Sequence, residues 1–368
     1  MLHRLFFFGT LRHLPLLEVV LGRSVDAQTV VPACLPHHEA CAVAEGPFPA
    51  LVPARGSEAD GVIVEGLSDQ DLERLNFYEG GFDYDLTSVT LADGSQARVY
   101  VCAPDRWTPT DPWRFEEWVR NWSDMSCRSA REVMGYFGAR DREEVGRMLP
   151  QIRTRAWART LAQGYRAGQG TLDGSVILDR EARVYAGFFA LDEVTLRHAR
   201  FDGGMSPAVE RSYLVGTDAA LVLPYDPVRD RVMLVEQVRV GPLGRRDPEL
   251  WQLEPIAGRV DPGEIPEDTA RREAREEARL TLTTLECVAR SYASPGSTTD
   301  YFHIFVGLAE LPDGSAGVAG NENEAEDIRS HLVSYDRFIE MAERQNLANT
   351  PLVLLAYWLA HHRKRLRS

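Results

Sequence analysis

Cysteine is scarce in this sequence, and its distribution excludes two kinds of protein. The 368 residues include five cysteines, an odd number at scattered positions: Cys34, Cys41, Cys102, Cys127 and Cys287. Neither a disulfide-stapled secreted domain nor a cysteine metal site has such spacing. We therefore expect reduced thiols and a cytoplasmic protein.

Long apolar runs are also missing. The apolar residues near the start are interrupted by Gly9, Arg12 and Pro15, without a clean signal-peptide cleavage site. The run PLVLLAYWLA at 351–360 is too short to span a bilayer, so we expect a buried helix there. The sequence predicts neither a membrane span nor a secretion signal.

Positive charge is in deficit. The chain carries 55 acidic and 41 basic residues, a formal net charge of −14. This balance argues against a general nucleic-acid-binding surface, because phosphate backbones would be repelled. A nucleotide substrate remains compatible with it, since a metal ion can offset the charge.

The length and the pattern along the chain predict two domains and a helical segment between them. Residues 1–105 alternate strand-like runs with turns, and one helix is expected at 67–79, capped by Ser68. Strands are expected at 2–8, 59–67 and 87–102, the last a hairpin around Asp93-Gly94.

Residues 106–181 are interpreted as a helical extension and linker, and residues 182–368 as a second α/β domain. The extension carries an apolar stripe at helical spacing that we assign to packing: Phe115, Trp118, Val119 and Trp122. The second domain contains a strand hairpin turning at 226–230 and closes with two helices, 335–346 and 350–364.

The stretch GRVDPGEIPEDTARREAREEARL, 258–280, carries the strongest chemical signal. Pro266 suits the first turn of a helix, and Glu273, Glu276 and Glu277 then share one helical face. Interleaved arginines make a solvated, ion-paired helix the simplest interpretation from composition alone. Carboxylates at this density are also what Mg²⁺ requires beside substrate phosphates.

The order of these residues resembles the Nudix box, Gly-x5-Glu-x7-Arg-Glu-U-x-Glu-Glu-x-Gly-U, where U is aliphatic. The positions in register are Gly258, Glu264, Arg272, Glu273, Glu276, Glu277 and Leu280. Ala274 is a small aliphatic residue, and Arg279 stands where the second glycine belongs. Because that glycine normally ends the helix in a left-handed conformation, Arg279 raises a question about the helix end, not about metal ligands.

The resemblance covers about 184–362, and over this range the chain is similar to the ADP-ribose pyrophosphatase branch of the Nudix superfamily. It rests on the segments GFFALD, FDGGMS, DAALVLPYDPVRDRVMLVEQVR, WQLEPIAG, SYASPGS and AEDIRSHLVS. It implies an α/β (α+β) protein whose C-terminal domain is an α/β/α sandwich with a mixed sheet.

The resemblance also implies metal ligands. Two or three Mg²⁺ ions, with Mn²⁺ as the alternative, would be held by the box carboxylates Glu273, Glu276 and Glu277, the carbonyl of Ala257, and Glu326. Glu264 would support the helix and the metal ligands without binding the metals directly. Glu276 would also take part in catalysis, and Glu324 would be the general base. Taken alone, Glu322, Glu324 and Glu326 would be an acidic surface loop.

Substrate contacts follow from the same resemblance. Arg211 and Arg239 match phosphate-contacting arginines, Phe188 an aromatic beside adenine, and Pro295 a proline that marks ADP-ribose specificity. Asp300 replaces a glutamate near the terminal ribose. Several of these positions belong to a strand-exchanged dimer in the family, so a homodimer is expected.

The implied reaction is hydrolysis of ADP-ribose to AMP and ribose 5-phosphate. The first alternative is another nucleoside diphosphate sugar, such as GDP-mannose. A Nudix-fold binder without catalysis is a third possibility, which the full set of box carboxylates opposes. No nucleic-acid or membrane partner is expected.

The N-terminal segment resembles the γ-glutamylcyclotransferase-like (AIG2-like) fold, a mixed α/β barrel. The resemblance rests on LFFFGTL (5–11) and YEGGF (78–82). It implies that Phe8, Gly9, Thr10 and Leu11 form an anion pocket of backbone N–H groups, and that Glu79 is the base. Tyr84 fits the motif, but Asp85 replaces its usual basic residue.

Two hypotheses remain for this domain: a cyclotransferase that releases 5-oxoproline, or a ligand-binding or regulatory module, which we favour slightly. A cyclotransferase-like domain followed by a Nudix domain also resembles bacterial proteins associated with tellurite resistance.

Overall fold

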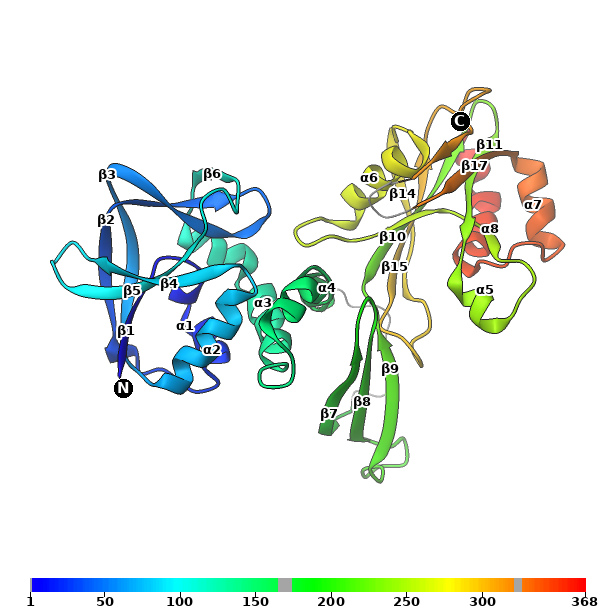
Figure 1. The fold of residues 1–368 in the computed structure, drawn as a ribbon. Helices are drawn as coiled ribbons and strands as arrows, with labels where there is room; N and C mark the ends of the chain where they lie inside the picture. Colours follow the sequence, from blue (N-terminus) through cyan, green and yellow to red (C-terminus); the bar gives the residue numbers. More distant parts are fainter. Residues whose placement is uncertain (1, 165–173, 321–325) are drawn as a thin grey trace. The chain divides into compact units, whose positions relative to one another are not determined.

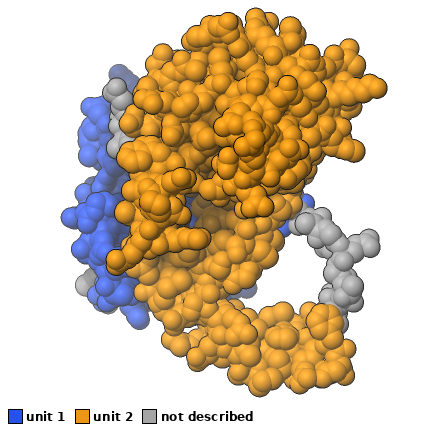
Figure 2. All heavy atoms as spheres, turned by 90° about the vertical axis from the view of Figure 1, so that its right-hand side faces the viewer, with its two compact units in different colours: residues 1–164 blue, residues 165–368 orange. Residues whose placement is uncertain are grey.

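The computed structural model describes residues 2–164, 174–320 and 326–368. The chain folds into two compact units, 1–164 and 165–368 (Figure 2). Among the described residues, none of the helices combines the length and apolarity needed to cross a membrane.

Unit 1 is built on a six-stranded mixed sheet that curls around its core (Figure 1). The strands follow the order β4-β5-β1-β3-β2-β6, and β1 and β5 run parallel while the other pairs are antiparallel. Their bounds are β1 His3–Phe7, β2 Val30–Val43, β3 Gly46–Leu67, β4 Tyr84–Thr90, β5 Gln96–Cys102 and β6 Pro109–Pro112.

Four α-helices complete unit 1: α1 Leu14–Leu21, α2 Asp69–Gly80, α3 Phe115–Met134 and α4 Arg142–Leu161. Two short 3₁₀ helices, Thr10–Arg12 and Ala27–Thr29, join them. The predicted cap of α2 is confirmed, because Ser68 accepts from the N–H of Asp71 while Asp71 accepts from the N–H of Ser68.

Helices α3 and α4 fall within the predicted extension at 106–181, and the structure groups both with unit 1. They are held together by a buried ion pair between Arg155 and Glu132. Of the apolar stripe, Trp118 is fully buried and donates to the carbonyl of Pro47 at 2.7 Å, which agrees with packing. Residues 165–173 of the predicted extension and linker lie outside the described residues.

Unit 2 contains an eight-stranded mixed sheet and a separate three-stranded sheet, β7-β8-β9. The large sheet has the order β14-β15-β10-β11-β17-β16, with β12 paired to β11 and β13 to β10. Strand bounds are β7 Val176–Ala186, β8 Ala190–His198, β9 Val209–Val215, β10 Asp218–Asp226, β11 Arg231–Val238, β12 Trp251–Glu254, β13 Ile256–Arg259, β14 Thr284–Tyr292, β15 Tyr301–Leu308, β16 Val318–Ala319 and β17 Ile328–Ser334.

Helices cover the large sheet in layers, and its core follows from the alternation of apolar residues. Unit 2 has α5 Val240–Arg245, α6 Pro266–Ala278, α7 Tyr335–Glu343 and α8 Thr350–Leu366. The closing helices α7 and α8 bury Phe338, Leu352 and Leu355 against β10, β11 and β15. Helix α6 packs on β13 and β10 through small residues, Ala270 and Ala274, which lets its acidic face approach the sheet. The predicted sandwich with a mixed sheet is confirmed.

Candidate active sites

Helix α6 forms where the sequence predicted it, and its two ends show why. Pro266 occupies the first turn with Glu267 and Asp268 near the positive end of the helix dipole. At the other end Arg279 adopts a left-handed conformation, φ 56° and ψ 32°. Its N–H donates to the carbonyl of Arg275 at 3.0 Å. The helix therefore ends as it would with glycine, at the steric cost of a side chain in the left-handed region.

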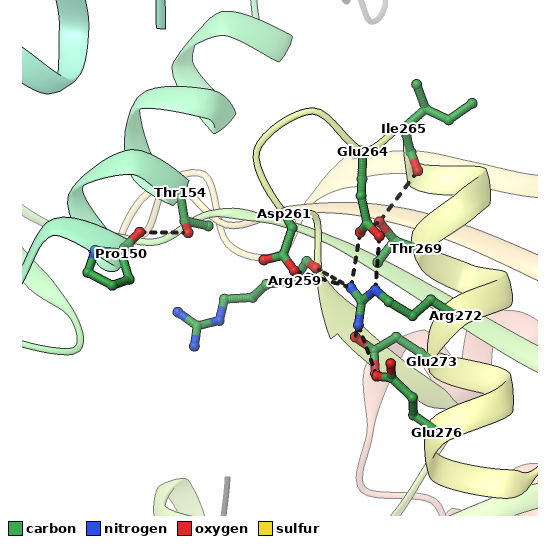
Figure 3. A network of polar contacts seen from close by, with 10 residues as sticks. All are labelled: Pro150, Thr154, Arg259, Asp261, Glu264, Ile265, Thr269, Arg272, Glu273 and Glu276. Carbon is green, nitrogen blue, oxygen red and sulfur yellow. Dashed lines mark hydrogen bonds and ion pairs between the residues drawn. The ribbon is translucent and has the colours of Figure 1, made fainter. Parts of the chain in front are cut away.

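Arg272 is the centre of the polar network on this helix (Figure 3). Its Nε lies 2.9 Å from Glu264 Oε1, while its Nη1 lies 2.6 Å from Glu273 Oε1 and 3.1 Å from Glu276 Oε2. Burial acts to lower the pKa of Arg272, but the hydrogen bonds and charges of Glu264 and Glu273 raise it overall. Glu264 also accepts from the Thr269 hydroxyl at 2.7 Å, so it ties the preceding loop to the helix.

Glu273 and Glu277 lie on the sheet-facing side of α6. Glu277 is 2% exposed, and burial together with the charges of Glu273 and Glu326 raises its pKa to about 9. Burial also raises the pKa of Glu273 to about 7, against the opposing effect of Arg272. The structure thus brings three carboxylates within electrostatic range of one another, and their repulsion favours a bound cation.

Strand β13 approaches these carboxylates closely. A Cβ on Gly258 would lie 1.7 Å from Glu273 Oε1, so only glycine fits beside that carboxylate. The N–H of Ala257 donates to Glu277 Oε2 at 3.4 Å. The backbone of β13 and the acidic face of α6 therefore form the two walls of one site.

The donor set fits a hard divalent cation, because it consists of carboxylate and backbone oxygens. Glu277 forms no ion pair with any described residue, so its buried carboxylate needs either a proton or a bound cation to neutralise it. In the described ranges no three acidic, histidine or cysteine side chains lie close enough to form a metal site by themselves. Instead, the guanidinium of Arg272 holds two of the box carboxylates.

The predicted substrate residues divide into those near this site and those apart from it. Arg239 acts on the pKa of Glu277 and is anchored by Glu254, 2.6 Å from its Nη2. Phe188 lies in the β7–β8 turn, half-exposed, with the guanidinium of Arg259 4.3 Å from its ring centroid. Both therefore flank the box on unit 2.

The other predicted substrate residues show no described contact with the acidic face of α6. Asp300 accepts from the Thr298 hydroxyl at 2.7 Å and the N–H of Thr217 at 3.2 Å, so its carboxylate is engaged in the local turn. Arg211 is exposed on β9 and donates to the carbonyl of Glu210, and Pro295 is exposed in the loop before β15. Glu322 and Glu324 lie outside the described residues.

Unit 1 contains a partly open cavity of about 50 Å³ where the sequence predicted an anion pocket. Its lining includes the whole predicted loop and the predicted base: Phe6, Phe7, Phe8, Gly9, Thr10, Leu11, Phe48, Pro49, Tyr78, Glu79, Phe82, Tyr84 and Tyr100. Glu79 is the one carboxylate among these, and burial raises its pKa to about 8. A carboxyl group with that pKa is poised to accept or donate a proton near neutrality.

Two tyrosines of the cavity are fixed by hydrogen bonds. The Tyr84 hydroxyl donates to the carbonyl of Pro49 at 2.8 Å, and the Tyr100 hydroxyl donates to Asn76 Oδ1 at 2.7 Å. Asp85, which follows Tyr84, is exposed. It therefore does not line the cavity as a basic residue in the motif would.

Sequence reasoning missed three arginines near these sites. Arg272 was noted only as part of the box, although its four nitrogen–oxygen contacts below 3.2 Å make it the main organiser. Arg259 on Phe188 and Arg153 beside Gly46 gave no signal, because neither belongs to a motif.

The comparisons with known proteins agree with this geometry. The NUDIX domain family matches residues 216–353, and the family described as Gamma-glutamyl cyclotransferase, AIG2-like, matches residues 5–120. The ADP-ribose pyrophosphatase of Escherichia coli (strain K12) is 40% identical over 52% of this chain and 90% of its own length. The GDP-mannose pyrophosphatase of Cronobacter sakazakii is 30% identical over 46% of this chain and 86% of its own.

Among solved structures, a crystal structure of an ADP compounds hydrolase covers 53% of this chain and 98% of its own, with 20% identity and a TM-score of 0.40. The chain belongs to the Nudix family through unit 2, which is a Nudix pyrophosphohydrolase. Unit 1 carries the cyclotransferase-like domain. Nudix hydrolases generally need a divalent metal.

Proposed function

We propose that unit 2 hydrolyses the pyrophosphate bond of ADP-ribose to AMP and ribose 5-phosphate with Mg²⁺. The observation that supports this most is the buried acidic face of α6, held against β13 in a chain that is 40% identical over 52% of its length to an ADP-ribose pyrophosphatase. Nucleoside diphosphate sugars are the class of substrate.

In this proposal each residue of the site has a separate role in binding the metal, binding the substrate or moving a proton. Glu273, Glu277, Glu326 and the carbonyl of Ala257 hold the metal, with Glu276 beside them. When bound, Mg²⁺ polarises a phosphoryl group and lowers the pKa of a coordinated water. Arg239, fixed by Glu254, places positive charge toward the substrate phosphates. Glu324 removes the proton from the attacking water.

The Arg272 network prepares this site. Because Arg272 also binds Glu264, the carboxylates of Glu273 and Glu276 are oriented before any cation arrives. In this proposal Glu264 acts from behind, through Arg272 and Thr269. Phe188, Pro295 and Asp300 line the site at the nucleoside and terminal-ribose ends of the substrate.

A substrate panel tests the proposal. ADP-ribose, GDP-mannose and diadenosine compounds are compared by kcat/KM with Mg²⁺ and with Mn²⁺, and the phosphate-monoester products are measured. ADP-ribose should give the highest value. GDP-mannose hydrolysis is the second candidate, supported by the 30% identical GDP-mannose pyrophosphatase, and a clear preference for it would replace our first choice.

We also propose a homodimer with strand exchange in unit 2. The three-stranded sheet exposes an unusual number of apolar side chains: Val176, Ile177, Leu178, Val184, Tyr185 and Leu214. Exposed apolar surface of this extent is typical of an interface.

The reaction is placed in the cytoplasm in this proposal. The odd number and scattered spacing of the cysteines support that location.

For unit 1 we propose a ligand-binding or regulatory module whose cavity holds a γ-glutamyl-type ligand, with its boundary after α4 instead of at residue 105. The second candidate is a γ-glutamyl cyclotransferase, favoured by the position of Glu79 in the cavity wall. Incubating the full chain with γ-glutamyl amines distinguishes them. Release of 5-oxoproline that is lost in Glu79→Gln would establish the enzyme, and binding without release would establish the module.

A further inference from the structure

Unit 1 has a second and larger hollow that neither proposed activity uses. Its volume is about 540 Å³, within the usual range of small-molecule sites, whereas the cavity beside Glu79 measures about 50 Å³. Among the described residues, Phe48 alone lines both spaces. The hollow is therefore a separate place on unit 1, and its occupant need not be the ligand of the cavity.

The ends of β2 and β3, strand β6 and the start of α3 form the walls of this hollow. Four of its described lining residues are aromatic: Phe48, Trp113, Trp118 and Trp122. Trp113 follows β6 directly, and its N–H donates to the carbonyl of Ala40 in β2 at 2.9 Å. Trp118 and Trp122 lie one turn apart on α3. Three indoles thus gather at one place, which we call the tryptophan hollow.

Packing fixes these indoles before any ligand binds. Trp118 is 2% exposed, and its Nε1 donates to the carbonyl of Pro47 at 2.7 Å. The rings of Trp113 and Trp118 meet at 47°, with 6.2 Å between their centroids. Trp122 packs on Trp157 of α4, with 5.7 Å between the ring centroids. Because Trp113 and Trp122 remain partly exposed, they present preformed aromatic surface to the hollow.

Carboxylates outnumber cations in the lining. Asp111 and Glu117 are exposed at the hollow, and neither side chain forms an ion pair or hydrogen bond with any residue that the structure describes. Arg114 is the one basic residue among the described lining residues. The excess of negative charge favours a positively charged ligand.

Arg153 lies beside the tryptophan hollow but acts toward the smaller cavity. A Cβ on Gly46 would lie 2.8 Å from its Nη2, so the guanidinium sits behind that part of the wall. Burial lowers the pKa of Arg153, and the charged neighbour that opposes this effect is Tyr78, which lines the smaller cavity. The charge of Arg153 is therefore not paired with Asp111 or Glu117.

An aromatic ring on the same helix already holds a cation of the chain. The guanidinium of Arg12 lies 4.4 Å from the ring centroid of Phe115, the first residue of α3. In the part of the chain that the structure describes, no such cation lies over Trp113 or Trp122. Indole rings attract cations more strongly than phenyl rings do. The two indoles are therefore available to a cation from outside the chain.

We propose that the tryptophan hollow binds an organic ammonium cation, a free small molecule with a quaternary or substituted ammonium group. Trp113 and Trp122 attract its charge through their ring faces, and Asp111 and Glu117 neutralise it. Trp118 lines the apolar part of the site. The volume of the hollow accommodates such a molecule whole.

Calorimetric titration of the full chain tests this with two probes of the same shape, choline and its uncharged carbon analogue 3,3-dimethylbutan-1-ol. Sodium chloride keeps the ionic strength equal in both titrations. Wild type should bind choline roughly 10-fold more tightly than the alcohol, because the ring faces and the carboxylates act on the charged probe. Equal affinity for the two probes, or no binding of choline, would overturn the proposal.

Tryptophan variants test the two aromatic walls. Trp122→Leu keeps an apolar side chain without the ring face, so its preference for choline should fall to about 2-fold or less. Trp113→Leu removes the other wall and should have the same effect. Trp122→Phe keeps a weaker ring face and should recover part of the preference. Thermal unfolding at the wild-type midpoint shows that a variant is folded, and a full preference in both folded leucine variants would contradict the assignment.

Two adjacent glutamates of α3 supply a matched pair. Glu117→Gln removes a lining carboxylate and should weaken choline binding by about 2- to 5-fold, the range of an exposed charge pair. Glu116→Gln removes the same charge beside the lining and should keep the wild-type affinity. Equal losses in the two variants would show a general effect of net charge and no carboxylate in the site.

Sedimentation with phosphatidylcholine vesicles distinguishes a free cation from a lipid headgroup. The chain should stay in the supernatant, because the proposed ligand enters the hollow whole. Sedimentation of wild type that Trp122→Leu abolishes would overturn the assignment to a free small molecule.

Discussion

At the residue scale, the two sites depend on carboxyl groups placed where water cannot fully solvate them. Glu277 and Glu79 both have raised pKa values because of burial. Their surroundings differ, however. Glu277 faces other carboxylates, and their mutual repulsion favours a bound cation. Glu79 faces an aromatic cavity and is suited to proton exchange.

Substitution of Glu277 tests the metal assignment. Glu277→Gln keeps the shape of the side chain but removes the charge, so kcat for ADP-ribose hydrolysis should fall by about 100-fold or more. Steady-state kinetics across a Mg²⁺ series measures this. Glu267→Gln, on the same helix and paired with Arg290 at 3.4 Å, is the control and should keep activity. Near-normal turnover in Glu277→Gln would exclude Glu277 as a ligand.

The raised pKa of Glu79 predicts a pH dependence of stability. Its pKa rises from 4.5 to about 8 on folding, so the folded state holds a proton that the unfolded state releases. The free energy of unfolding of unit 1 therefore falls as pH rises between these values, by about 4 kcal/mol at most. Glu79→Gln cannot titrate and should lack this fall.

Urea unfolding of wild type and Glu79→Gln at pH 5 and pH 8 measures the difference. At pH 8 the free energy of unfolding of the wild type should fall relative to that of Glu79→Gln. Parallel behaviour of both proteins would show that Glu79 is well solvated through the cavity, and its role as a base would lose its physical support.

At the element scale, helices with end signals were predictable and long-range strand pairs were not. Ser68 and Pro266 mark the starts of α2 and α6 by local chemistry that the structure confirms. The long β2–β3 pair gave no comparable signal, because its two proline-containing strands depend on each other for their hydrogen bonds. The same holds for α4, whose docking on Gly80 and Gly81 is a tertiary contact.

The candidate sites follow the same rule. The box carboxylates Glu273 and Glu277 occupy one helix, so spacing alone placed them together. The position of Arg153 depends on how α4 packs, which local sequence does not specify. Arg153 and Arg155 are two residues apart on that helix, yet one is paired with Glu132 and the other faces Gly46.

The end of α6 supplies a prediction at this scale. Arg279 is left-handed at φ 56°, a conformation that costs a non-glycine residue roughly 1 kcal/mol. Arg279→Gly should therefore raise the unfolding free energy of unit 2 by about 1 kcal/mol, offset in part by greater freedom of the unfolded chain. Thermal unfolding compares it with Arg275→Gly, an exposed position inside the helix, which should destabilise by a similar amount. Destabilisation by Arg279→Gly would mean that the arginine side chain itself holds the helix end.

At the scale of the whole molecule, the chain joins two units with separate chemistry. Unit 1 surrounds an aromatic cavity with one acid, and unit 2 presents an acidic helix face to a phosphate substrate. The two units share no candidate site residue. Glu79→Gln should thus leave hydrolysis intact, and Glu277→Gln should leave ligand binding in unit 1 intact.

The proposed dimer makes a sharper prediction, because Arg211 lies on the exposed three-stranded sheet. Among the described contacts, Arg211 reaches only its own neighbour, Glu210. If strand exchange carries Arg211 into the partner's site, Glu277→Gln and Arg211→Gln should each be inactive as homodimers. After the two are unfolded and refolded together, half of the dimers are mixed and each has one intact site.

Activity should then recover to about a quarter of the wild-type value, since one site in four combines a native Glu277 with a native Arg211. Mixing Glu277→Gln with Glu273→Gln is the control, because both changes fall in the same box and at most a trace of activity can return if Glu273 and Glu277 act in one chain. A mixture of Arg211→Gln and Glu277→Gln that stays inactive, while light scattering shows dimers, would place Arg211 in the site of its own chain.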